Sequence, residues 1–174
     1  MKCAIVLSTL LLLTRLASAV DGYKDFEFGM SVAEVKKIVK IPLSRKDSGN
    51  DVVWYLSTVE GFPFGGKKVP ISFGFVGGKL LRVALKIPTD KTGSIINSLT
   101  EKYGPSSSSS GLESMVTLDS TPNAEAYVAF DGDTVFVKIT SDESMQQRAL
   151  LIYTSPEYDR HVLQSQKKSV EDDL

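Results

Sequence analysis

Residues 69–87 read VPISFGFVGGKLLRVALKI, and this stretch decides the fold that the sequence predicts. Apolar and polar residues alternate on both sides of a glycine pair, which is typical of two antiparallel strands joined by a tight turn. A three-residue turn at 77–79 would place the apolar side chains of both strands on one face. These side chains are Val69, Ile71, Phe73 and Phe75, then Leu81, Val83, Leu85 and Ile87.

A helix is predicted upstream of this hairpin, and its first turn carries a clear start signal. Ser31 and Glu34 have the spacing of a capping box, and Met30 and Val35 occupy the two positions of a hydrophobic staple. The helix must end before Pro42. Its apolar stripe consists of Val35, Ile38 and Val39.

Between this helix and the hairpin, the sequence predicts a polar loop at 44–50 and a strand at 52–58. The strand contains Trp54, the one tryptophan of the chain, among apolar neighbours, so we expect its ring in the core.

The second part of the chain has the same order of predicted elements. A helix is predicted at 92–103 and ends at Gly104-Pro105. A flexible serine-rich loop at 106–110, a strand at 115–118 and a hairpin at 125–140 follow, with Gly132-Asp133 as the turn. In that hairpin Ala126, Val128 and Phe130 should share a face with Val135, Val137 and Ile139. A last strand is predicted at 149–154.

The spacing of these elements suggests an internal duplication. Ser31 and Thr92 are 61 residues apart, as are Trp54 and Met115. We therefore expect an α+β fold with two similar halves, each a helix followed by antiparallel strands, with the helices on one sheet face. The predicted boundaries are 20–90 and 91–155, and the polar tail 156–174 is predicted to be frayed.

The first 19 residues have the three parts of a cleavable signal peptide. Lys2 supplies the positive charge, residues 4–13 are mostly apolar, and Ala17-Ser18-Ala19 is a small-x-small cleavage motif. Cleavage between Ala19 and Val20 predicts a periplasmic or secreted protein with no transmembrane segment after removal of the signal.

Composition excludes several kinds of chemistry. The one cysteine, Cys3, lies in the signal, which leaves the exported chain without disulfides, thiolate metal ligands or a lipid-anchoring cysteine. Loss of Lys2 and Arg15 leaves 18 basic and 21 acidic residues, a net charge of −3. That balance gives no electrostatic reason to expect a nucleic acid partner.

The segment 61–67, GFPFGGK, fits the phosphate-loop pattern G-x-x-x-x-G-K. A phosphate loop needs a following helix and a Ser or Thr after the lysine, but here Lys68 follows and a strand is predicted next. We therefore interpret the segment as a hairpin loop whose two rings fold over the sheet edge. An alternative is that Phe62 and Phe64 form an exposed tip that binds a partner.

No other motif predicts a catalytic or metal site. His161 is the one histidine and lies in the polar tail, so it has no expected catalytic or metal-ligating partners. Asp131-Gly132-Asp133 lacks the further ligands of a calcium loop and is interpreted as a turn. No cofactor is expected.

The stretch FGMSVAEV at 28–35, followed by Trp54-Tyr55, resembles a group of small exported bacterial proteins. The group includes outer-membrane-assembly lipoproteins of the SmpA/OmlA type and tandem-repeat β-lactamase inhibitor proteins. The resemblance implies a helix packed on an antiparallel sheet, and a role in the cell envelope.

Three functions remain open from the sequence. The first is an exported, non-enzymatic binding protein whose sheet face and loops contact another protein or an envelope component. The second is an envelope assembly or structural factor. The third is a hydrolase that uses carboxylates alone on a cell-envelope substrate, which requires two convergent Asp or Glu side chains in a cleft.

Overall fold

The computed structural model describes residues 19–48, 51–57 and 61–172 of the chain. The predicted signal peptide lies outside these residues except for Ala19. The helices are α1 (Val32–Val39), α2 (Thr92–Tyr103), α3 (Leu112–Thr117) and α4 (Pro156–Asp172), with a 3₁₀ turn at Thr89–Lys91. The strands before α2 are β1 (Gly22–Tyr23), β2 (Phe26–Glu27), β3 (Ser44–Ser48), β4 (Val52–Leu56), β5 (Phe62–Phe64), β6 (Lys67–Val69), β7 (Ile71–Val76) and β8 (Lys79–Ile87). Those after α2 are β9 (Ser108–Ser109), β10 (Glu125–Phe130), β11 (Val135–Ser141) and β12 (Gln147–Thr154).

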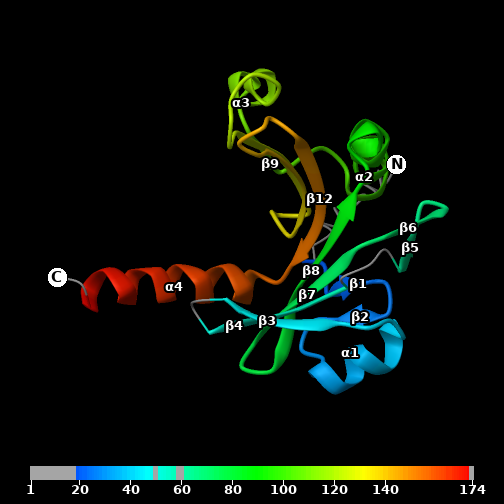
Figure 1. The fold of residues 1–174 in the computed structure, drawn as a ribbon, viewed down its shortest axis with the longest axis vertical. Helices are drawn as coiled ribbons and strands as arrows, with labels where there is room; N and C mark the ends of the chain where they lie inside the picture. Colours follow the sequence, from blue (N-terminus) through cyan, green and yellow to red (C-terminus); the bar gives the residue numbers. More distant parts are fainter. Residues whose placement is uncertain (1–18, 49–50, 58–60, 173–174) are drawn as a thin grey trace, which may run out of the picture.

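One eight-stranded antiparallel sheet forms the centre of the molecule, as Figure 1 shows. Its strand order is β3-β4-β7-β8-β12-β11-β10-β9, and two small hairpins, β1-β2 and β5-β6, lie outside it. Strands before α2 make up one side of this sheet and strands after α2 make up the other. The fold is therefore α+β, as predicted.

The predicted duplication stays a prediction. The equivalence of Trp54 and Met115 on which it rested is wrong, because Trp54 lies in β4 whereas Met115 lies in α3. In the sheet, β8 and β12 pair at the centre, and each is the last strand of its side. This arrangement makes β8 the counterpart of β12, which differs from the equivalences that the sequence spacing suggested.

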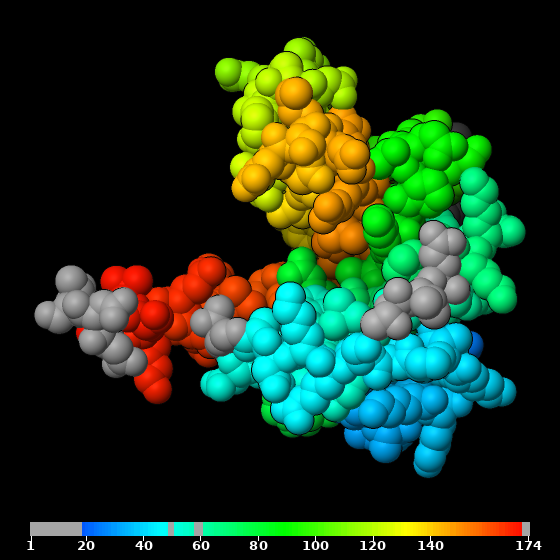
Figure 2. Space-filling view, in the orientation of Figure 1, coloured from blue at the N-terminus to red at the C-terminus, as the bar shows by residue number. Residues whose placement is uncertain are grey.

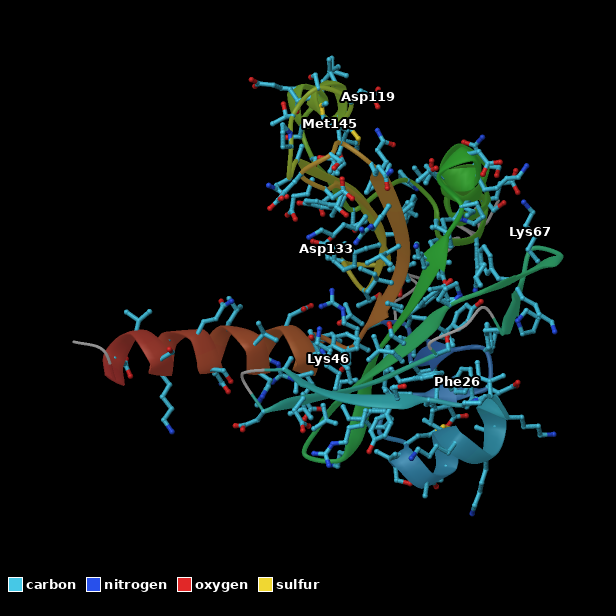
Figure 3. All side chains as sticks on the ribbon, viewed as in Figure 1. Phe26, Lys46, Lys67, Asp119, Asp133 and Met145 are labelled. Carbon is cyan, nitrogen blue, oxygen red and sulfur yellow. The ribbon has the colours of Figure 1, made fainter. Side chains whose placement is uncertain are left out.

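A single apolar cluster lies on one face of the sheet and contacts α1, α2 and both small hairpins. Val35 of α1 and Leu99 of α2 are buried in it, so these two helices pack on one sheet face as predicted. Phe26, labelled in Figure 3, lies edge-on against Phe73 with ring centroids 4.8 Å apart. The cluster includes residues from both sides of the sheet, which therefore share one core.

The register of the first hairpin agrees with the prediction only at a distance from its turn. Ile71 pairs with Leu85 and Phe73 with Val83, but a β-bulge then places Phe75 opposite Leu80 and leaves Leu81 without a partner on β7. The turn has two residues, Gly77 and Gly78, both with positive φ, as a type I′ turn requires. The prediction that Leu81 shares the core face is wrong.

The second hairpin has the predicted register. Ala126 pairs with Ile139, Val128 with Val137 and Phe130 with Val135. Pairing stops at Phe130 and Val135, so residues 131–134 form the turn, and Asp131, Gly132 and Asp133 have φ values of 54°, 62° and 65°. The prediction of a two-residue type II′ turn is therefore wrong, because the loop has four residues and three of them in succession have positive φ.

Three local predictions are wrong. Residues 44–48 form β3, an edge strand whose charged side chains hide the alternation that marks a strand. The stretch predicted as a strand at 115–118 lies in and just after helix α3. The tail is not frayed over 156–172 but forms α4, with Pro156 at its start and Glu157 and Asp159 in its first turn.

Figure 1 shows α4 extending from the end of β12, away from the sheet. Within the described ranges, no helix combines the length and apolar character needed to cross a membrane.

Candidate binding surfaces

The sheet face opposite the core carries a hollow of about 500 Å³ between the two sides of the sheet. We call it the open-face groove. Its walls come from β3 and β4 on one side and from β11 and β12 on the other, with β7 and β8 between them. Figure 2 shows this hollow between the cyan strands below and the orange strands above.

The apolar part of the groove comes from side chains that alternate with core residues along their strands. Its members are Trp54, Leu56, Ala84, Leu150 and Ile152. Trp54 pairs with Gly74 across β4 and β7, and its ring lies over that glycine, 3.1 Å from the position that a Cβ atom would occupy. The ring is half-buried and faces away from the main core. The prediction of a core tryptophan is therefore wrong.

The first turns of α4 pack beside one end of the groove. Tyr158 is buried beside Leu81 and Val52, and its ring centroid lies 6.2 Å from that of Trp54. The bulge explains this contact, because it turns Leu81 away from the core and toward α4.

Three basic residues line the groove: Lys46, Arg82 and Lys138. The Arg82 guanidinium lies over the Tyr158 ring, 4.6 Å from its centroid, and Lys138 forms a 2.6 Å ion pair with Glu125. Burial raises the pKa of Asp159, and the nearby Arg82 partly offsets that rise. Figure 3 labels Lys46 at the lower rim. No aspartate or glutamate is among the described residues that line the groove, although Glu125 and Asp159 lie beside two of its basic residues.

The two phenylalanines predicted as a binding loop differ in their burial. Phe62 is 8% exposed and packs against Tyr23 and Phe26, with ring centroids 6.0 and 5.8 Å away. Phe64, two residues further along β5, is half-buried. The segment is a hairpin, as its plain interpretation predicted, but the exposed-tip prediction is wrong for Phe62.

Phe64 lines a second hollow, of about 430 Å³, which we call the α2–hairpin cavity. Its other walls come from Ile95 and Leu99 of α2 and from Leu151 and Tyr153 of β12. Figure 1 shows α2 and the β5-β6 hairpin on the same side of the molecule. This cavity lies on the core side of the sheet, since Leu151 and Tyr153 belong to the main core.

Two buried tyrosines lie beside this cavity. The ring centroids of Tyr23 and Tyr153 are 4.7 Å apart. Burial raises the pKa of Tyr23 to about 12. Burial also raises the pKa of Tyr153, and the neighbouring Tyr103 adds to that rise. Both phenols stay neutral at physiological pH, so neither supplies an anion to the cavity.

The acidic turn at 131–133 is held by hydrogen bonds to other groups of the chain, as a structural turn would be. Asp131 accepts hydrogen bonds from the Val20 amide at 2.8 Å and from the Thr134 hydroxyl at 3.0 Å. Asp133 accepts hydrogen bonds from the Ser107 and Ser108 hydroxyls at 2.6 and 2.8 Å. The serine run predicted as a flexible connector is therefore anchored, and Ser108–Ser109 forms β9.

Among residues 19–48, 51–57 and 61–172, no three His, Cys, Asp or Glu side chains gather in a way that would hold a metal ion. His161 is half-buried on α4, far along the chain from the acidic turn.

Sequence reasoning missed most of the groove. Lys46, Arg82 and Lys138 occupy ordinary polar positions of three strands, and only the strand order brings them to one surface. The sequence feature that could have located the groove is the alternation of apolar and polar residues, because it identifies a second face on each strand.

Comparison with known proteins gives a family. Residues 23–173 match a protein family described as "Uncharacterised protein". The chain is also 31% identical, over 157 residues, to an "Uncharacterized protein" of Haemophilus influenzae (strain ATCC 51907 / DSM 11121 / KW20 / Rd). That match covers 90% of this chain and 88% of the relative. No solved structure matches the chain. With nearly all of its described length matched, the chain belongs to this family of uncharacterised proteins.

Proposed function

We propose that this protein is an exported, non-enzymatic binding protein, and that its open-face groove binds a partner protein with acidic and apolar side chains. The observation that carries the proposal is the composition of the groove, an apolar centre with Lys46, Arg82 and Lys138 around it and no lining carboxylate. Three basic residues around one hollow are not a consequence of overall composition in a chain with a net charge of −1.

The shape of the groove supports a protein partner. Six strands of one sheet contribute to it, so it is a broad, preformed surface rather than a loop. Trp54, Tyr158 and Arg82 lie next to each other at one end of it. Tryptophan, tyrosine and arginine are the residue types that most often dominate the binding energy of protein interfaces.

The position of Val20 supports the export part of the proposal. Its backbone nitrogen lies 2.8 Å from a carboxylate oxygen of Asp131. Cleavage after Ala19 would turn that amide into an ammonium group, and the hydrogen bond would become an ion pair. We expect N-terminal sequencing of the protein recovered outside the cytoplasm to begin at Val20, whereas a start at Met1 would contradict export with cleavage.

The alternative from another class is a hydrolase that uses carboxylates alone. Such an enzyme needs two convergent carboxyl groups in its cleft, and the described lining of the open-face groove and of the α2–hairpin cavity contains none. Asp47 and Asp51 line a third hollow, but the Asp47 carboxylate already forms an ion pair with Arg45 at 2.8 Å. The envelope assembly role implied by the resemblance of residues 28–35 is compatible with a binding groove and differs only in the partner.

A photo-cross-linking experiment tests the proposed surface. A photoreactive amino acid at Leu150 reports on the groove, and the same amino acid at Val116, which is 68% exposed on α3, serves as the control. We expect a discrete protein adduct in living cells from position 150 and not from position 116.

A charge reversal then tests the chemistry of the partner. Lys46→Glu should lower the yield of the adduct several-fold, because rim charges control association. Arg45→Glu is the matched control, since Arg45 lies on the same strand but does not line the groove. The absence of an adduct at position 150, or equal losses for both substitutions, would overturn the proposal.

A further inference from the structure

We infer that the α2–hairpin cavity binds a long-chain fatty acid, with the acyl chain against its apolar walls and the carboxylate among its lysines. The inference goes beyond the proposed function and does not rest on it. The cavity lies on the opposite face of the sheet from the open-face groove, and the two share no lining residue.

The walls of the cavity suit an apolar chain. Leu99, Leu151 and Tyr153 are only 6%, 2% and 6% exposed, so they form a fixed inner surface. Ile95 and Phe64 are half-buried and complete the apolar lining from the helix and the hairpin. Its volume of about 430 Å³ lies within the range of pockets that hold small ligands.

The charged part of the lining is entirely positive. Lys67 of β6, Lys91 before α2 and Lys102 in the last turn of α2 line the cavity, and no acidic residue does so. Lys91 lies 3.9 Å from the exposed Asp90, and the Lys102 ammonium lies 4.8 Å from the centroid of the Tyr103 ring. Neither contact is a close ion pair. The lysines therefore remain available to an incoming anion.

An apolar hollow with a cationic border matches one kind of molecule, a single apolar chain with an anionic end. An uncharged alcohol of the same length would leave the lysines without a counter-charge, and a short carboxylate would leave the walls exposed to water. Both features of the cavity are used only when chain and carboxylate occur together.

Displacement of a fluorescent fatty acid by unlabelled ligands tests this inference. We expect saturated fatty acids to bind about fourfold more tightly for each added methylene group until the cavity is filled. Hexadecanol should bind at least tenfold more weakly than hexadecanoate, and raised salt should narrow that difference. Equal binding of alcohol and acid, or affinity that does not change with chain length, would overturn the inference.

Two matched pairs of variants place the ligand in this cavity. Ser98→Phe fills the cavity from an exposed position of α2 and should weaken binding at least tenfold, whereas Asn97→Phe, at an exposed position that does not line it, should leave binding unchanged. Lys67→Glu should weaken binding of the acid but not of the alcohol, and Lys68→Glu should weaken neither. Equal effects within either pair would show that the fatty acid binds elsewhere. All of these variants leave the open-face groove intact, so the cross-linking result stays independent.

Discussion

Tyr23 and Tyr153 are the residues whose ionisation the fold changes most clearly. Their rings lie 4.7 Å apart, and burial raises the pKa of Tyr23 to about 12. In the unfolded chain a tyrosine ionises near pH 10. The folded protein therefore keeps these phenolic protons to a higher pH than the unfolded chain does. The contribution of the two neutral phenols to the free energy of unfolding is complete below about pH 10 and is lost as pH rises toward the folded pKa values.

We therefore expect the free energy of unfolding to fall between about pH 10 and about pH 12, because the unfolded chain loses the phenolic protons first. Urea denaturation across this range measures the slope. Tyr23→Phe should flatten the slope, whereas Tyr127→Phe, on the opposite sheet face, should leave it unchanged. An unaltered slope in Tyr23→Phe would contradict the argument.

The residues that sequence reasoning placed correctly are those with partners close in the chain. The Ser31 amide donates to Glu34 at 2.8 Å and the Glu34 amide donates to the Ser31 hydroxyl at 3.4 Å, as the capping-box spacing predicts. Hydrogen bonds from the Ser31 backbone and side chain lower the pKa of Glu34. Trp54 was misplaced because its apolar neighbours in sequence do not indicate which sheet face is covered.

Among the elements, β8 and its bulge have the sharpest testable consequence. Leu80 and Leu81 are consecutive and both buried, yet Leu80 packs in the main core and Leu81 packs under Tyr158 of α4. Truncation of either side chain to alanine should cost about 2–5 kcal/mol of stability. Only Leu81→Ala should also release the first turns of α4.

Hydrogen exchange separates the two variants. Amides at 158–162 should exchange faster in Leu81→Ala than in Leu80→Ala under conditions where both proteins remain folded. Equal protection of α4 in the two variants would show that the bulge does not anchor this helix.

Elements were predicted well where periodicity was strong and poorly where it was weak. Residues 92–103 have a helical stripe and a Gly-Pro stop, and α2 has those bounds. The five residues of β3 contain no apolar side chain, so pairing with β4 alone makes them a strand. In α3, Leu112 and Val116 are 80% and 68% exposed, so its helical form does not follow from a buried stripe.

At the scale of the whole molecule, one core joins the two sides of the sheet. Strands β8 and β12 pair over six residues at the centre, and the main cluster includes Phe75 from one side and Phe130 from the other. A shared core predicts a single cooperative unfolding transition rather than separate transitions for the two sides.

Trp54 fluorescence and far-UV circular dichroism should therefore give the same urea midpoint. Leu151→Ala in β12 should lower the midpoint of the Trp54 signal, although Trp54 lies on the other side, because about 2–5 kcal/mol is lost from the shared core. Val116→Ala, at an exposed site, should change the free energy of unfolding by less than about 0.5 kcal/mol. Separate midpoints for the two probes would contradict a single unit.

The sequence by itself determined what short-range physics controls. Alternation set the strands of both hairpins, capping and stop signals set α1 and α2, and together they predicted the α+β class. These features need only partners a few residues away, so no knowledge of the rest of the chain is required.

Only the tertiary structure decided which surfaces are covered and which stay open. The groove joins Lys46, Arg82 and Lys138, and the cavity joins Lys67 with Lys102, because sheet order and helix packing bring distant segments together. The bulge at Leu81 arose in the same way, from α4 packing on one side of β8 and the core on the other. Alternation identifies two faces on every strand, but burial of one of them depends on the whole chain.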